Sequence, residues 1–256
     1  MGLFPRFDEQ VPEPSENLPR KTGLARLWQL ASRDLWGNFL AGLLALLGCV
    51  PFAGGLVLAV IASSMPLAPL CGLVGGAIAG PELCGLADTL LRGLRDDVGR
   101  AWWPTYRRAW RRNAKTALLP GALGGALLSA QIFTLLHAGA LAIDLVTSVA
   151  LVLGIVILLG LSLYLWPQMA LMELSFVQLL KNSVLLFIGQ LPRSAAALAF
   201  WTAYILASLR FFSAALSLLP VTNLWLPALP ALFLVYPGLE EAFQIEEKFQ
   251  DGNQSR

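Results

Sequence analysis

The sequence predicts an all-α fold: a polytopic transmembrane helix bundle of about six spans, with kinked or broken helices and amphipathic cytoplasmic segments. Hydrophobic residues make up 57% of the chain and charged residues 13%, whereas a soluble globular domain carries about 25% charged residues. Several stretches approach or exceed the roughly 20 apolar residues that cross a ~30 Å hydrocarbon core as a helix. Basic residues gather in alternate connections between these stretches, as the positive-inside rule requires.

Three parts follow one another along the chain. We expect a polar cytoplasmic segment over residues 1–34, a transmembrane helical domain over 35–239 and an acidic and polar tail over 240–256. The first segment lacks the early apolar core of a secretory signal, so we expect a flexible lead-in. Within the membrane domain, residues 92–115 and 170–193 are predicted to be amphipathic cytoplasmic stretches.

The spans are expected in order at residues 35–61, 67–91, 116–136, 141–166, 194–219 and 224–239. Pro51 near the middle of the first span favours a kink or break, because a proline leaves one backbone carbonyl without its helical donor. The last segment contains three prolines and is bent at best, so whether it crosses fully is left open. Six crossings keep both termini cytoplasmic, whereas five would place the acidic tail outside.

Glycines recur every fourth residue on the second and third spans. Small residues at this interval allow helix backbones to approach closely in lipid. We expect these glycines to pack helices together within one molecule, with homodimerisation as the alternative. The helix-packing positions are Gly72, Gly76, Gly80, Gly121 and Gly125.

The stretch 101–115 is predicted to be an interfacial helix. Its aromatic residues share one helical face, and its basic residues occupy the adjoining faces. Aromatic rings favour headgroup depth, while cations reach anionic lipid. The segment is either a topology anchor or a docking face for a cytoplasmic partner, and it is too short and too close to the membrane for nucleic acid. Its interface residues are Trp103, Tyr106, Arg107, Arg108, Trp110, Arg111, Arg112 and Lys115.

Five polar residues are candidates for intramembrane chemistry. Arg210 in the fifth predicted span requires a partner or a wet cavity, unless it snorkels to the headgroups. Its candidate partners are Asp144 and Glu82, and Glu82 follows a proline and is a weak candidate for proton relay. Asn38 is expected to bond a freed carbonyl in the first span, and Glu173 to have a local hydrogen bond or a partner cation.

Motifs of nucleotide hydrolysis, zinc proteolysis and serine hydrolysis do not occur in the sequence. The three cysteines lack metal-ligand spacing, and a lone histidine, His137, has no second histidine or close carboxylate. We therefore expect no enzyme activity, no catalytic residues, no cofactor and no metal.

A series of short motifs carries a resemblance to a known family. They are Leu35-Trp36-Gly37-Asn38, the basic-aromatic run 103–115, Tyr164-Leu165-Trp166-Pro167, Leu179-Leu180-Lys181-Asn182-Ser183 and Leu191-Pro192-Arg193-Ser194. In order and spacing these motifs, over roughly residues 28–248, resemble the YesL-like bacterial membrane proteins, a family of unknown function. The resemblance implies a multi-pass protein of the bacterial inner (plasma) membrane with a link to carbohydrate uptake.

Two functions are therefore expected. The first is an accessory or component of solute transport, with carbohydrate as one substrate class. The alternative is a membrane scaffold that docks partners or binds lipid through the basic-aromatic helix. The expected partners are the lipid bilayer, and either transporter subunits or further copies of the chain.

Overall fold

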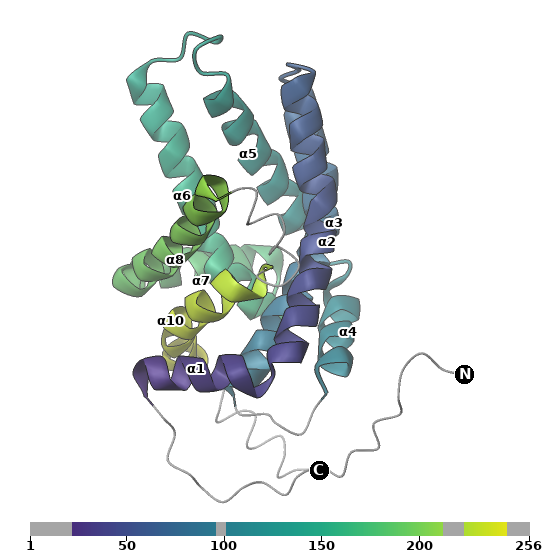
Figure 1. The fold of residues 1–256 in the computed structure, drawn as a ribbon, viewed down its shortest axis with the longest axis vertical. Helices are drawn as coiled ribbons and strands as arrows, with labels where there is room; N and C mark the ends of the chain where they lie inside the picture. Colours follow the sequence, from purple (N-terminus) through teal and green to yellow (C-terminus); the bar gives the residue numbers. More distant parts are fainter. Residues whose placement is uncertain (1–21, 96–100, 212–222, 245–256) are drawn as a thin grey trace, which may run out of the picture.

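A computed structural model describes residues 22–95, 101–211 and 223–244, and these residues form helices joined by turns, with no strand. Figure 1 shows long helices standing side by side, with shorter helices gathered around one end. The helices are α1 (Gly23–Arg33), α2 (Leu35–Ile61), α3 (Leu67–Leu94), α4 (Trp102–Asn113), α5 (Leu118–Leu136), α6 (Leu145–Leu171), α7 (Phe176–Gly189), α8 (Leu191–Arg210) and α10 (Trp225–Phe243). The all-helical prediction is confirmed.

Four of these helices, α2, α3, α5 and α6, are long and apolar enough to cross a membrane. The helices α7 and α8 together meet the same test but are bent by 97° at their junction, so the described residues give four spans, or five if the bent pair is one span. The prediction was about six. Part of the fifth predicted span, residues 212–219, lies outside the described residues.

The segment predicted as the sixth span forms α10, which is not among the helices apolar enough to cross. Instead, α10 is a core helix of the protein. Val235 and Leu239 are fully buried, and the helix packs against α8, α3, α2 and α6. Its two inner prolines, Pro230 and Pro237, lie within a continuous helix. Burial inside protein, rather than in lipid, accounts for its apolar sequence.

The membrane helices also run through their prolines. The helix α2 continues past Pro51, α3 past Pro81 and α6 past Pro167. The break predicted at Pro51 is therefore absent. The sharp bend lies instead between Gly189 and Leu191, where Gln190 leaves the helical conformation.

The central helix is α3, which packs along both α2 and α5. A Cβ atom added at Gly76 would lie 2.9 Å from the Cα of Gly125, and one at Gly80 would lie 2.6 Å from the carbonyl oxygen of Ala117. A Cβ at Gly72 or Gly121 would likewise meet backbone of the opposite helix. The five predicted packing glycines thus all lie at the contact between α3 and α5, where close backbone approach requires them.

The largest hydrophobic core lies at the end of the bundle where the short helices gather (Figure 1). Leu86, Leu90 and Leu91 of α3 form its centre, and α10 contributes Val235 and Leu239. Side chains of α1, α2, α4, α6 and α8 complete it. We call this part of the molecule the basic end, because it carries α4.

The basic end includes a helix that the sequence analysis missed. Residues 1–34 were expected to be a flexible lead-in, but Gly23–Arg33 form α1, with Leu30 buried in the core. Residues 1–21 lie outside the described part of the chain. Figure 1 shows α1 lying across the bundle rather than along it.

Candidate functional site

The helix α4 is the element that brings most of the predicted site residues together. Tyr106, Ala109 and Asn113 are buried, and their spacing of three and four places them on one helical face. This face packs against α3, with weaker contacts to α2 and α6. The buried stripe shares Tyr106 with the predicted aromatic face, whereas Trp103 and Trp110 of that face are 47% and 37% exposed.

Glu82 of α3 is the polar centre of this contact. Its carboxylate accepts a hydrogen bond from the Tyr106 hydroxyl through Oε2, and one from Trp110 Nε1 through Oε1 at 2.9 Å. Both donors are neutral, and among the described residues Glu82 forms no ion pair. The arrangement therefore leaves a carboxylate whose two oxygens are bound by donors from α4.

Small residues create the space for this pair of hydrogen bonds. A Cβ atom on Gly85 would lie 2.8 Å from two ring atoms of Tyr106, and one on Gly48 of α2 would lie 2.9 Å from Cβ of Glu82. The Tyr106 side chain is 3% exposed. Burial first, and then the hydrogen bond to Glu82, raise the pKa of Tyr106 above its usual value, so the hydroxyl keeps its proton and remains a donor.

The contact between α3 and α5 shows where Glu82 lies along α3 relative to the apolar part of the bundle. Gly80 faces Ala117, the residue directly before α5 begins. Glu82 comes two residues after Gly80, so it lies just beyond the apolar part that α3 and α5 share. Its position is at the margin of the membrane helices rather than at their middle, which fits a charged carboxylate better than a proton relay.

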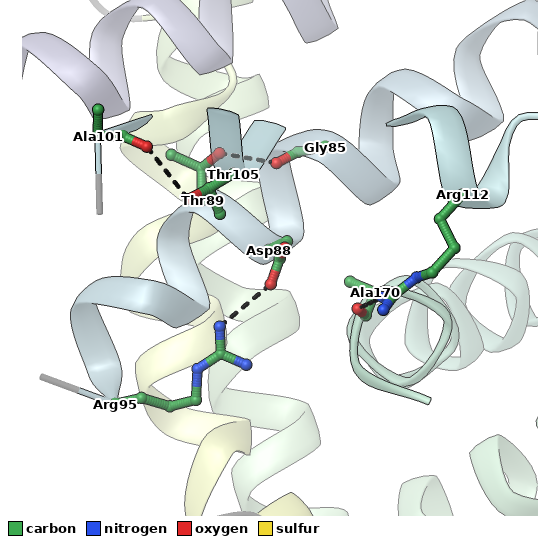
Figure 2. Close-up of polar contacts among 8 residues, drawn as sticks. All are labelled: Gly85, Asp88, Thr89, Arg95, Ala101, Thr105, Arg112 and Ala170. Carbon is green, nitrogen blue, oxygen red and sulfur yellow. Dashed lines mark hydrogen bonds and ion pairs between the residues drawn. The ribbon is translucent and has the colours of Figure 1, made fainter. Parts of the chain in front are cut away.

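Arg112 of α4 connects this helix to α6. Its guanidinium donates a hydrogen bond to the carbonyl oxygen of Ala170 in the last turn of α6 (Figure 2). The last carbonyls of a helix have no partner within the helix, so a donated side-chain bond satisfies one of them. Arg112 was predicted to face lipid or a partner, whereas the structure uses it to join α4 to α6.

Four cations of α4 and its C-terminal extension remain outside these contacts. Arg107, Arg108, Arg111 and Lys115 are exposed, as is Trp103. The first three lie on the side of α4 opposite its buried stripe, and Lys115 follows after the helix ends. We call Arg107, Arg108, Arg111 and Lys115 the cationic face.

Two ion pairs stabilise the neighbouring part of α3. Arg92 pairs with Asp34, which lies between α1 and α2, and Arg95 pairs with Asp88 at 3.1 Å. Figure 2 shows the second pair beside the hydrogen bond from Thr89 to the Gly85 carbonyl. Most of this part of α3 is buried beneath other helices.

The remaining candidates are dispersed. Arg210 is the exposed last residue of α8, with its guanidinium carbon 5.7 Å from the centre of the Phe211 ring. Among the described residues, no ion pair joins it to Glu82 or Asp144. Asp144 is the N-cap of α6 and accepts a hydrogen bond from the Thr147 amide at 3.2 Å. Glu173 is exposed between α6 and α7.

Asn38 is buried in the first turn of α2, and a second asparagine bonds a carbonyl close to it. Asn223, just before α10, donates to the carbonyl oxygen of Phe39 at 3.1 Å and accepts from the Trp225 amide at 3.2 Å. Gly42 leaves room for this side chain, because a Cβ there would lie 2.8 Å from the Trp225 amide nitrogen. Asn223 thus joins α10 to α2, a contact 184 residues apart in sequence.

A buried polar network near the end of α6 was also missed. The fully buried Gln168 donates to the Tyr164 carbonyl at 3.1 Å and to the Ser183 hydroxyl at 3.2 Å, while its Oε1 has no hydrogen-bond partner. The Tyr164 and Ser194 hydroxyls are 2.8 Å apart. These bonds join α6, α7 and α8. A glutamine directly after Pro167 in an apolar helix is the sequence signal that could have indicated it.

No group of three or more His, Cys, Asp and Glu side chains in the described residues could hold a metal ion. Comparison of the chain with protein-family models, with curated proteins and with solved structures gives no significant match.

Proposed function

We propose that this chain is a non-enzymatic multi-pass membrane protein that binds the headgroups of anionic lipids through the cationic face and so acts as a membrane scaffold. The proposal rests on the way in which contacts with α3 and α6 hold α4 in place. Glu82 of α3 and the Ala170 carbonyl of α6 hold α4 on two sides through Tyr106, Trp110 and Arg112. Arg107, Arg108, Arg111 and Lys115 stay exposed. A cationic helix fixed at the margin of the apolar helices has the position that headgroup binding requires.

The charges support this binding energetically. A basic residue near an anionic membrane surface contributes about 1 kcal/mol, and the effect falls off within a Debye length of about 8 Å at physiological salt. Four cations at one margin therefore suffice for a measurable lipid preference. The positive-inside rule favours the cytoplasmic leaflet of a bacterial plasma membrane, and an even number of crossings would place both termini there.

The test replaces Arg107, Arg108 and Arg111 with glutamine and measures the anionic lipid that co-purifies with the protein by mass spectrometry. The matched control replaces Arg33, Lys181 and Arg193 with glutamine, which removes the same number of positive charges elsewhere in the chain. We expect the first variant to lose most of its anionic lipid and the control to retain it. Equal lipid content in the two variants would contradict the proposal.

A second candidate, an accessory role in solute transport with carbohydrate as one substrate class, is supported by the YesL-like resemblance and by Gln168. The buried Oε1 of Gln168 has no partner, and polar groups inside membrane helices commonly serve transport. Uptake of a broad panel of sugars by a deletion strain tests this role. Normal uptake of every sugar would count against it, whereas a defect rescued by the wild-type chain and not by Gln168→Leu would favour it.

A further inference from the structure

The helix α1 carries an apolar stripe, and the hydrophobic core covers only part of it. Leu30 is 3% exposed and Leu27 packs at the edge of the core, while Leu24 and Trp28 on the same stripe are 82% and 76% exposed. The opposite side of α1 carries Gln29, which is half-buried, and Arg33, which is exposed. The helix is therefore amphipathic, and half of its apolar side has no protein partner among the described residues.

The uncovered side continues into the surface of a membrane helix. After the turn at Asp34, α2 begins with Leu35 and Trp36, which are 53% and 68% exposed. α2 is one of the four helices able to cross a membrane, and α1 lies across its end (Figure 1). Large apolar side chains thus occur on both sides of the turn where the chain enters the bundle.

We infer that α1 lies in the plane of the membrane, with Leu24 and Trp28 inserted at the boundary between headgroups and acyl chains. An amphipathic helix of this kind buries its apolar face at that boundary and leaves its polar face in water, and tryptophan is enriched at that depth. Lipid is the occupant that fits, because the uncovered surface is continuous with that of a spanning helix. This anchor is separate from the cationic face of α4 and does not depend on it.

The test uses the full-length protein, one copy in each lipid nanodisc, with its three cysteines replaced by alanine. Single cysteines at positions 24, 28 and 33 (Leu24→Cys, Trp28→Cys and Arg33→Cys) carry an environment-sensitive fluorophore. We expect the label at 24 and 28 to emit at shorter wavelength, to be quenched by shallow spin-labelled lipid and to be shielded from iodide. The label at Arg33 is the control and should be quenched by iodide.

Two results would overturn the inference. Equal iodide quenching at 28 and 33, without lipid quenching, would place Trp28 in water. Shielding from iodide without lipid quenching would mean that protein covers the face. If the cysteine-free background does not fold, brominated-lipid quenching of native tryptophan fluorescence answers the same question, because the Trp28→Phe variant should lose a quenched component and the Trp110→Phe variant provides the comparison.

Discussion

The basic end and the apolar part of the bundle are held together in different ways. At the basic end, large side chains of α1, α3, α6 and α10 form a core that is joined by ion pairs and hydrogen bonds. In the apolar part, α3 and α5 meet through glycines, while leucines and valines of α2 and α6 point outward. Hardly any of the apolar window of α6 is buried inside the protein.

The difference matches the two ways in which helices associate in water and in lipid. In water, burying a leucine or valine contributes about 1.5–3 kcal/mol, so large side chains gather inside. In lipid an outward leucine costs nothing, and helices associate through close packing of small residues and through hydrogen bonds. The glycine contact between α3 and α5 is packing of the kind found between helices in lipid. The leucine core around α10 is packing of the kind found in water-soluble proteins.

The largest effect is expected at the ion pair of the basic end. Replacing Asp34 with leucine deprives the Arg92 guanidinium, whose side chain is 8% exposed, of this carboxylate, and removing the counter-charge of a buried group costs about 3–5 kcal/mol. The thermal unfolding midpoint in mild detergent should fall strongly. The exposed control, Arg108→Met, should stay within about 0.5 kcal/mol of wild type. Equal midpoints for the two variants would show that this end does not depend on its buried charges.

The next effect tests the glycine contact in the apolar part. A Cβ at Gly125 would lie 2.8 Å from the Cα of Gly76, whereas one at the adjacent Gly124 has no atom within 4 Å. Gly125→Leu must displace backbone and should cost about 3 kcal/mol or more. Gly124→Leu should be tolerated, because its side chain enters lipid. Size-exclusion profiles and melting midpoints would separate the pair, and a well-folded Gly125→Leu protein would argue against this packing.

The third prediction concerns the margin between the two parts. Tyr106→Phe removes the hydrogen bond to Glu82, and a bond to a charged group contributes about 1.5–3 kcal/mol. α4 should then detach more often, so trypsin should cleave within 107–112 faster than in wild type. The exposed Trp103→Phe is the control and should leave cleavage unchanged. Identical cleavage of both variants would mean that Glu82 does not hold α4.

The smallest effect lies at the opposite end of the bundle, at the N-cap of α6. Hydrogen bonds to Thr147 lower the pKa of Asp144 below its usual value. A depressed native pKa stabilises the fold above the unfolded pKa of about 3.9, and this contribution is lost as the pH falls further. Asp144→Asn keeps a capping oxygen without a titrating group, so its melting midpoint should fall less in acid than that of wild type. Parallel acid profiles would contradict this role.

The four membrane helices could be predicted from the sequence to within a few residues, and the predicted bounds of α2 coincide with those observed. Long apolar stretches have one stable form in lipid, because every backbone polar group must be satisfied within a helix. The glycine spacing likewise indicated close helix approach at α3 and α5. In contrast, the segment of α10 was predicted to be a span from its apolar start, although the whole helix, with Glu240 and Glu241, is not apolar enough to cross.

The candidate site was predictable in its parts and not in its arrangement. The sequence indicated the basic-aromatic helix and Glu82 separately, but the grouping of Trp103, Tyr106 and Trp110 on one face did not reveal that Tyr106 is buried against α3. Arg112 was grouped with the other cations because its neighbour, the Ala170 carbonyl, is 58 residues away in sequence. Contacts of this range depend on how helices pack, which local periodicity does not contain.

Hydrophobicity along the chain determined that this protein is helical and suited to a membrane, because the need to satisfy backbone groups in oil acts on each segment by itself. Tertiary structure decided which apolar helix becomes a core, which cation of α4 binds the end of α6, and that α1 turns across the bundle with Leu24 and Trp28 uncovered. These three features depend on the shape and polarity of neighbours that are distant in sequence. They are therefore determined by packing and not by composition.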